Sequence, residues 1–212
     1  MKIVNKVNRS NINSLLVNEG QSKMSESMIE FAKSIPEINK VEDLKVLDRL
    51  FYEYFTRDKN TKKFESTAEQ IFDRKTFSGC SDIGLAISPL LRHKGIPTVY
   101  VESASIEWIK DIQEDNENKE LMKGHIFLEI YLNNKWYLYD PTFHLVYDNY
   151  DYNNLCLPRN YYVFAKAMNS FDLDVHSVKD EKELATNVLK DFDISTCTNP
   201  NYKEYNLKEK NK

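Results

Sequence analysis

Residues 77–97 read FSGCSDIGLAISPLLRHKGIP, and this stretch decides the fold that the sequence predicts. Apolar residues recur in it at steps of three and four, the period of one buried helix face: Ile83, Ala86, Ile87, Leu90 and Leu91. Gly95 and Pro97 mark the end, since glycine readily adopts the left-handed conformation and proline cannot continue a helix. Pro89 is expected to kink this helix without abolishing it. The pattern predicts a helix of about four turns.

Cys80 stands where this helix begins. Gly79 precedes it, and Ser81 and Asp82 are alternative caps, so unpaired backbone N–H groups and the positive end of the helix dipole surround the sulfur. Such surroundings stabilise a thiolate. A cysteine in an apolar helix is more often a small buried hydrophobe. The nucleophile interpretation of Cys80 therefore requires partner residues.

A second informative segment, residues 124–143, reads GHIFLEIYLNNKWYLYDPTF. Two runs rich in β-branched and aromatic residues flank Asn133 and Asn134, and asparagine tolerates the positive φ angles of a two-residue hairpin turn. The segment therefore predicts a β-hairpin. If the two asparagines are the whole loop, Leu132 pairs with Lys135.

That register places His125 and Asp140 on one face of the hairpin. Asp140 lies opposite Phe127, and His125 shares a face with Phe127 because side chains alternate along a strand. Asp140 is then one diagonal step from His125, within reach of its imidazole. A three-residue loop would move Asp140 to the other face.

Cys80, His125 and Asp140 together form a nucleophile, base and orienter set. Taken singly, each has an ordinary explanation. His125 could be a polar residue on an edge strand, and Asp140 before a proline is a common turn former. The combination favours catalysis over these separate explanations.

On these residues the chain resembles the transglutaminase-like superfamily, cysteine enzymes with a papain-like core. The matching pieces are GCSD at 79–82, LLRHKGIP at 90–97, GH at 124–125 and WYLYDPT at 136–142. The resemblance covers about residues 65–145 and implies an α+β fold with the nucleophile helix packed on an antiparallel sheet. It also implies that Cys80 is the nucleophile, His125 the general base and Asp140 the residue that orients the histidine.

The chain departs from the family pattern at two points. Phe127 stands where the family usually has a tryptophan, two residues after the histidine. The upstream side chain that often completes the oxyanion hole is not evident. Gln70 is one candidate, and the alternative is a glutamine on the exposed side of a short helix.

The 212 residues, 41% of them hydrophobic, suffice for one globular domain. We predict an N-terminal helical extension over 1–64, a transglutaminase-like core over 65–176, and a C-terminal helix with a mobile charged tail over 177–212. Helices are expected near 25–34, 41–55, 66–73, 106–112 and 177–192, and strands near 98–101 and 161–167. The acidic insertion 113–120 is either a substrate-facing or gating loop or a solvated surface excursion.

The amino-acid composition argues against several kinds of binding partner. The net charge is −4, with 29 basic residues interspersed among 33 acidic ones, which argues against nucleic acid. No stretch reaches the roughly 18 apolar residues that span a bilayer, and no membrane is expected. His93, His144 and His176 have no partner at metal-ligand spacing, so no structural zinc and no cofactor are predicted.

The cysteine count and the N-terminus bear on the compartment. Three cysteines are an odd number and do not suggest a disulfide framework, which favours a reducing compartment. The first twenty residues lack the apolar run of a secretory signal. The sequence thus predicts a cytoplasmic protein, with a signal peptide already removed as the alternative.

The resemblance and the residues together predict acyl transfer on amide bonds of peptides or proteins through a Cys80 thioester. Water as acceptor would make the protein a protease, amidase or deamidase, and an amine would make it a transglutaminase. The alternative is a catalytically silent module of the same fold that binds a protein partner on the tyrosine-rich segment 147–162.

Overall fold

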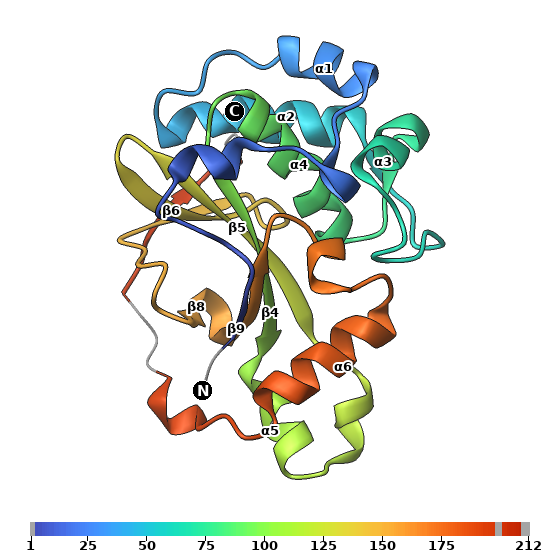
Figure 1. Cartoon of the computed structure of the whole chain (residues 1–212), viewed down its shortest axis with the longest axis vertical. Coiled ribbons are helices and arrows are strands. Elements are labelled where there is room, and N and C mark those ends of the chain that lie inside the picture. The colour runs from blue at the N-terminus through green and yellow to red at the C-terminus, as the bar shows by residue number, and fades with distance from the viewer. Residues whose placement is uncertain (1–2, 198–200, 209–212) are drawn as a thin grey trace.

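A computed structural model of the chain describes residues 3–197 and 201–208. Its centre is a mixed, mostly antiparallel sheet with strand order β1-β9-β4-β5-β6-β7-β10, and β8 pairs with β9 beside this path (Figure 1). The strands are β1 Val4–Asn5, β4 Thr98–Ser105, β5 Gly124–Leu132, β6 Lys135–Asp140, β7 Leu145–Asp148, β8 Cys156–Leu157, β9 Tyr161–Ala167 and β10 Lys203–Asn206. The short strands β2 Thr56–Arg57 and β3 Thr76–Phe77 form a separate parallel pair.

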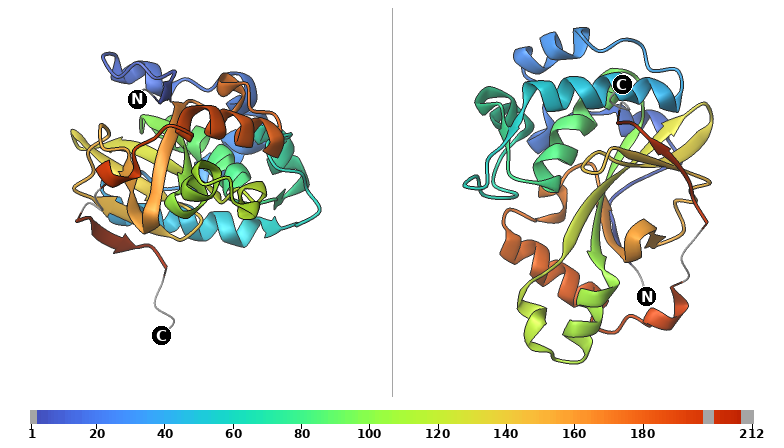
Figure 2. Two further views of the ribbon diagram at one scale, coloured as in Figure 1. Left: turned by 90° about the horizontal axis from the view of Figure 1, so that it is seen from below. Right: turned by 180° about the vertical axis from the view of Figure 1, so that it is seen from behind.

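The helices lie at the two ends of this sheet. Helices α1 to α4 gather at one end and α5 and α6 at the other, as both Figure 1 and Figure 2 show. The α-helices are α1 Glu26–Lys33, α2 Leu44–Tyr54, α3 Ala68–Arg74, α4 Cys80–His93, α5 Ile106–Gln113 and α6 Val178–Leu189. Short 3₁₀ turns are η1 Ile12–Leu16, η2 Gly20–Ser22, η3 Val41–Asp43, η4 Glu117–Glu120, η5 Pro158–Asn160, η6 Phe171–Leu173 and η7 Ile194–Thr196.

Helix α4 is the buried centre of the fold, as its apolar period predicts. It starts at Cys80 and continues through Pro89 to His93, and Gly95 follows with a positive φ of 77°. Gly84 allows a close approach to the sheet, because a Cβ there would lie 2.7 Å from Cγ2 of Ile126. The helix and strand β5 are therefore held in fixed relation, which positions Cys80 relative to the start of that strand.

The predicted hairpin is confirmed, including its register. Leu132 pairs with Lys135, and Asn133 and Asn134 have positive φ angles of 52° and 60°. Two such residues make a turn whose twist matches that of the flanking strands. The ladder continues to the pair of Leu128 with Tyr139. Asp140 is therefore on the face that the sequence indicates.

The hydrophobic core crosses the predicted segment boundaries at 64 and 176. The largest cluster joins Phe51 and Phe55 of the N-terminal segment to Ile87 and Leu90 of α4 and to Leu128 of β5. A second cluster packs α5 and α6 against β9. The first residues also join the sheet, because β1 pairs with β9. The division into extension, core and tail stays a prediction.

The mobile tail predicted for 198–212 is wrong for residues 203–206. These residues form β10, which pairs antiparallel with β7, and Tyr205 lies opposite Val146. Residues 198–200 and 209–212 lie outside the described part of the chain. The charged composition concealed the strand, because an edge strand that is solvated on one face needs few apolar residues.

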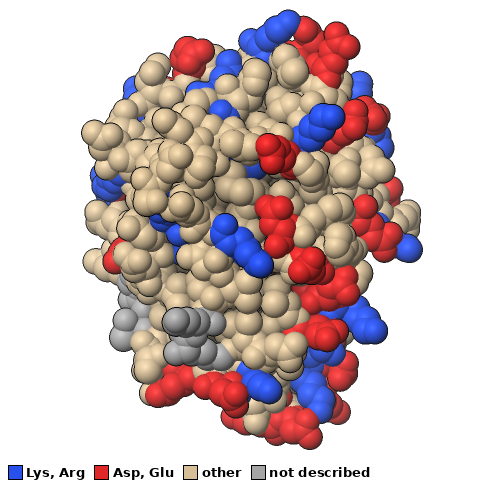
Figure 3. All heavy atoms as spheres, in the orientation of Figure 1, with Lys and Arg blue, Asp and Glu red and all other residues tan. Residues whose placement is uncertain are grey.

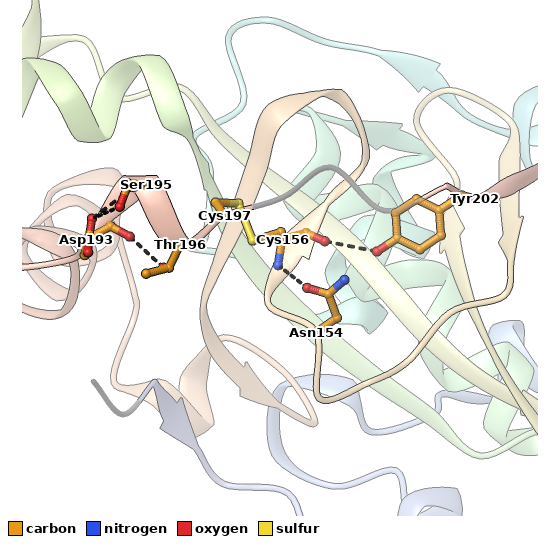
Figure 4. The surroundings of a disulfide bond; sticks show 7 residues. All are labelled: Asn154, Cys156, Asp193, Ser195, Thr196, Cys197 and Tyr202. Atoms are coloured by element: carbon orange, nitrogen blue, oxygen red, sulfur yellow. Dashed lines mark hydrogen bonds between the residues drawn. A yellow bond between two sulfur atoms is a disulfide. The ribbon is translucent and has the colours of Figure 1, made fainter.

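The expectation of no disulfide is also wrong. Cys156 and Cys197 are bonded, which ties β8 to the segment after α6 (Figure 4). Asn154 accepts the N–H of Cys156 at 3.0 Å, and the Tyr202 hydroxyl donates to the Cys156 carbonyl at 3.0 Å. The odd cysteine count concealed the pair, because the third cysteine is the unpaired Cys80. The number of cysteines therefore no longer supports a reducing compartment.

None of the helices in the described part of the chain is both long and apolar enough to span a bilayer.

Candidate active site

The start of helix α4 holds Cys80 at a partly buried position with an open helix terminus. Gly79 is the N-cap residue, and no side chain caps this end. Asp82, one of the two predicted caps, instead accepts the N–H of Ser78 and a guanidinium N–H of Arg74, both at 2.8 Å. No side chain therefore caps the N–H groups of the first turn, and these groups lie beside the sulfur of Cys80.

His125 and Asp140 form a buried pair beside this terminus. His125 Nε2 lies 3.0 Å from Asp140 Oδ2, and the two residues are 4% and 0% exposed. Cys80 lies near this pair, because its side chain is among the groups that raise the pKa of His125. Because Nε2 contacts the aspartate, Nδ1 is the nitrogen available to the thiol. The structure thus brings the three predicted residues together in the order cysteine, histidine, aspartate.

The surroundings of His125 favour its protonated form. Burial lowers its pKa, but the hydrogen bonds and negative charges of Asp140 and Cys80 outweigh burial and raise the pKa from 6.5 to about 9. The ring is then an imidazolium at neutral pH. Cys80 therefore has both the cationic ring of His125 and the open end of α4 beside it.

Asp140 is held by three donors and not by the histidine alone. The backbone N–H of Phe143 donates to Oδ1 at 3.2 Å, and Arg159 Nη2 lies 3.2 Å from Oδ2. The sequence analysis did not find Arg159. It reaches the site from η5, and no spacing relative to the three motifs marks it.

Aromatic rings enclose the imidazole. The ring centroid of His125 lies 4.7 Å from that of Phe127, 5.2 Å from Tyr161 and 5.6 Å from Phe143. Phe127, two residues after His125, thus forms one wall around the imidazole. Phe143 is 49% exposed and forms the rim, where a substrate would meet an apolar surface.

Gln70, the candidate oxyanion residue, serves a different purpose. Its side chain accepts the N–H of Thr67 at 2.9 Å and completes a capping box at the start of α3. This is the exposed glutamine that the sequence gives as the alternative. Tyr52 also adjoins the site: burial, then the charges of Asp48, Asp140 and Cys80, raise its pKa. Its hydroxyl donates to the Pro141 carbonyl at 2.9 Å.

Two buried glutamates adjoin the site. Glu102 is fully buried, and within the described part of the chain neither of its carboxylate oxygens has a hydrogen-bond partner. Burial, then Glu181 and Cys80, raise its pKa well above the usual value. Glu181 packs against Gly124, where a Cβ would lie 2.3 Å from Oε1, and burial raises its pKa to about 7. Both carboxyls thus bind protons more tightly than surface glutamates.

The acidic insertion 113–120 packs on its neighbours. The Trp108 indole N–H donates to the Lys119 carbonyl at 2.9 Å, and Gln113 Nε2 donates to the carbonyls of Leu189 and Phe192. Lys182 of α6 pairs with Glu120. Acidic side chains gather on the lower part of the face in Figure 3, over α5 and α6. A gating role for this insertion is a proposal.

Within the ranges 3–197 and 201–208, no group of three or more His, Cys, Asp or Glu side chains lies close enough to hold a metal ion. His144 is engaged elsewhere, with Nδ1 2.6 Å from Asp48 Oδ2. Asp48 also accepts from the Tyr139 hydroxyl at 3.2 Å. This second histidine–aspartate pair ties the turn before β7 to α2, and Asp48 also joins α2 to β6 through Tyr139.

Comparison with known proteins gives one informative likeness. No family model matches the chain, and no curated protein matches it. A solved structure of a candidate cysteine protease from Cytophaga hutchinsonii is similar, with a TM-score of 0.55 and 14% sequence identity over 79% of this chain. The chain spans 50% of the length of that structure.

At this level of identity the likeness establishes the fold. The predicted α+β class, a helix packed on an antiparallel sheet, is confirmed, and the likeness is consistent with the papain-like, transglutaminase-like core.

Proposed function

We propose that this protein is a cysteine hydrolase or acyltransferase that acts on amide bonds of peptides or proteins. The observation that carries the proposal is the buried pair of His125 and Asp140, 3.0 Å apart, beside Cys80 at the open start of α4. The fold likeness to a candidate cysteine protease supports the hydrolase side. All three side chains are present and lie near one another, which favours an enzyme over a silent binding module.

The first half of the reaction forms a thioester. The Cys80 thiolate attacks the amide carbonyl carbon, and the resulting oxyanion accepts hydrogen bonds from the N–H groups of the first turn of α4. The His125 imidazolium gives its proton to the leaving nitrogen as the C–N bond breaks. Asp140 holds the ring with Nδ1 toward the sulfur and stabilises its positive charge.

The second half releases the acyl group. Neutral His125 takes a proton from the acceptor, which attacks the thioester carbonyl, and the C–S bond breaks to regenerate the thiolate. Water gives hydrolysis, and a primary amine gives transamidation. The apolar rim at Phe143 suits a substrate with an apolar side chain next to the reacting amide.

The disulfide bears on where the protein acts. Disulfides persist in oxidising compartments and are rare in the cytosol. The pair of Cys156 and Cys197 therefore favours an oxidising compartment over the cytoplasm that the sequence analysis predicts.

The test is site-specific alkylation followed by turnover. Wild-type protein is treated with iodoacetamide between pH 5.5 and 9, and labelling of Cys80 is followed by mass spectrometry, with His125→Ala as the comparison. We expect Cys80 to stay reactive below pH 7 and His125→Ala to lose that low-pH reactivity.

Turnover is then measured with a fluorogenic peptide library, with and without a fluorescent primary amine. Cys80→Ala should abolish both release and amine incorporation. A wild-type Cys80 that reacts only at alkaline pH, as a free thiol does, would contradict the proposal.

A further inference from the structure

Arg159 forms an ion pair with Asp140 through the same carboxylate oxygen that contacts His125. Its Nη2 lies 3.2 Å from Oδ2 of Asp140, and His125 Nε2 lies 3.0 Å from that same oxygen. Asp140 is fully buried, and the Arg159 side chain is 28% exposed. A largely buried carboxylate thus lies between two cationic groups.

The local chain conformation fixes the guanidinium in this place. Arg159 and Asn160 both have φ angles of 60°, in the left-handed region that non-glycine residues seldom adopt. The guanidinium stacks 3.5 Å over the Phe143 ring, and the Phe143 N–H binds the other oxygen of Asp140. Arg159 and Phe143 therefore hold both carboxylate oxygens from one side.

The segment that carries Arg159 is anchored on both sides. Leu157 pairs with Tyr161, and Cys156 is disulfide-bonded to Cys197. Tyr161, two residues after the arginine, contacts the His125 ring. The segment 156–161 thus supplies both a cation to Asp140 and a wall to the imidazole.

We propose that Arg159 is a positioning residue that fixes Asp140 and limits how tightly His125 holds its proton. The inference rests on the proposed function. Without a counter-cation, a buried carboxylate in contact with imidazole stabilises the imidazolium strongly and makes it a poor proton donor to the leaving nitrogen. Arg159 neutralises part of that charge through its ion pair with Asp140.

Other charged and titratable groups also face this cluster. They are Cys80 of α4, Tyr52 of α2, Lys123 before β5, Tyr147 of β7 and Tyr161 of β9. The charge of Arg159 lowers the pKa of Tyr147 and of Tyr161, while Asp140 raises both. The field of the guanidinium thus acts on several groups around the histidine.

The test measures the protonation of His125 directly, by NMR titration of protein labelled with ¹⁵N-histidine. We expect Arg159→Gln to raise the pKa of His125 by about 0.5–1 unit, since a partly exposed cation is screened. Turnover should fall about tenfold, and the alkaline limb of the pH profile should move upward with the histidine. Arg159→Lys keeps the positive charge and should return the pKa of His125 most of the way to its wild-type value.

Arg74→Gln is the matched control. Arg74 makes an ion pair of similar exposure with Asp82 on the other side of Cys80, and its loss should leave the His125 titration unchanged. Asp140→Asn should also remove the effect of Arg159→Gln, because the arginine acts through the aspartate.

A His125 titration in Arg159→Gln within 0.2 unit of wild type would overturn the proposal and leave an ion pair that only anchors the loop. If Arg159→Gln does not fold, Arg159→Met takes its place, since it removes the charge and keeps an apolar side chain against Phe143. An unchanged His125 titration in that variant would overturn the proposal in the same way. The NMR readout needs no turnover, so an inert Cys80 would defeat the proposed function without deciding the role of Arg159.

Discussion

His125 Nε2 and Asp140 Oδ2 lie 3.0 Å apart, on adjacent strands of one hairpin and one diagonal step from each other. The two-residue turn at Asn133 and Asn134 sets this contact, because one more or one fewer loop residue would put the aspartate on the other face. The position of the orienting carboxylate is therefore determined by a turn remote from the site.

Asp140→Asn should impair catalysis more than binding. The amide keeps the shape, but it removes the negative charge that raises the pKa of His125, so that pKa should fall. We expect a loss of about 10²- to 10⁴-fold in kcat. Steady-state kinetics and histidine NMR measure the two effects. Asp148→Asn is the control. It removes the ion pair with Lys135 and alters hydrogen bonds from Asn149 and Tyr205, none of which involves His125. Equal losses in both variants would argue against an orienting role.

Glu181→Gln should stabilise the protein at alkaline pH. The folded state raises the pKa of Glu181 from 4.5 to about 7, so the folded protein binds a proton that the unfolded chain loses. The stability that this carboxyl contributes is present below about pH 4.5 and is lost as the pH rises to about 7. Urea unfolding at pH 8 should show a gain of about 1–3 kcal/mol for Glu181→Gln, and little change at pH 4.5.

Glu183→Gln provides the comparison for that result. Glu183 lies on the same helix at an exposed position, and its removal makes the same change in net charge. An equal gain in both variants would point to overall charge and not to the buried carboxyl.

Gly84→Ala should destabilise the fold by about 1–3 kcal/mol, because the new methyl group would lie 2.7 Å from Ile126 Cγ2. The alkylation rate of Cys80 should fall as well, since α4 must move away from β5. Ser88→Ala on the same helix removes a buried hydroxyl that has no partner among the described residues, and it should be neutral or stabilising. Unchanged stability in Gly84→Ala would show that the helix moves freely on the sheet.

Removing the disulfide through Cys156→Ala should lower the free energy of unfolding by about 2–4 kcal/mol. Thermal unfolding with and without reductant measures this, and the variant should no longer respond to reductant. Cys80→Ala should keep the full response. A wild-type melting temperature that does not change on reduction would show that the bond contributes nothing to stability.

The sequence could predict the parts of the site that depend on local pattern. The period of α4 and its stop at Gly95 place Cys80 at a helix start, and the asparagine turn places Asp140 beside His125. Both predictions follow from local sequence and require no knowledge of which distant segments are in contact.

The remaining features depend on contacts between distant segments. Arg159 reaches Asp140 only because β8 folds back onto β9, and Glu181 reaches Gly124 only because α6 packs against the sheet. The strand at 203–206 and the pair of Cys156 with Cys197 also join segments that no period links. A single sequence contains no signal for such pairings.

The pairing of β1 with β9 has a consequence for synthesis on the ribosome. Strand β1 can pair only after Ala165 and Lys166, the partners of Val4 and Asn5, have been synthesised. Sheets that join such distant residues form slowly, because the loop must close before the contact stabilises it. Cys80, His125 and Asp140 are all translated before Arg159 and Tyr161. A nascent chain therefore carries its thiol for a period without the completed surroundings, and we expect activity to appear only after the ninth strand has been made.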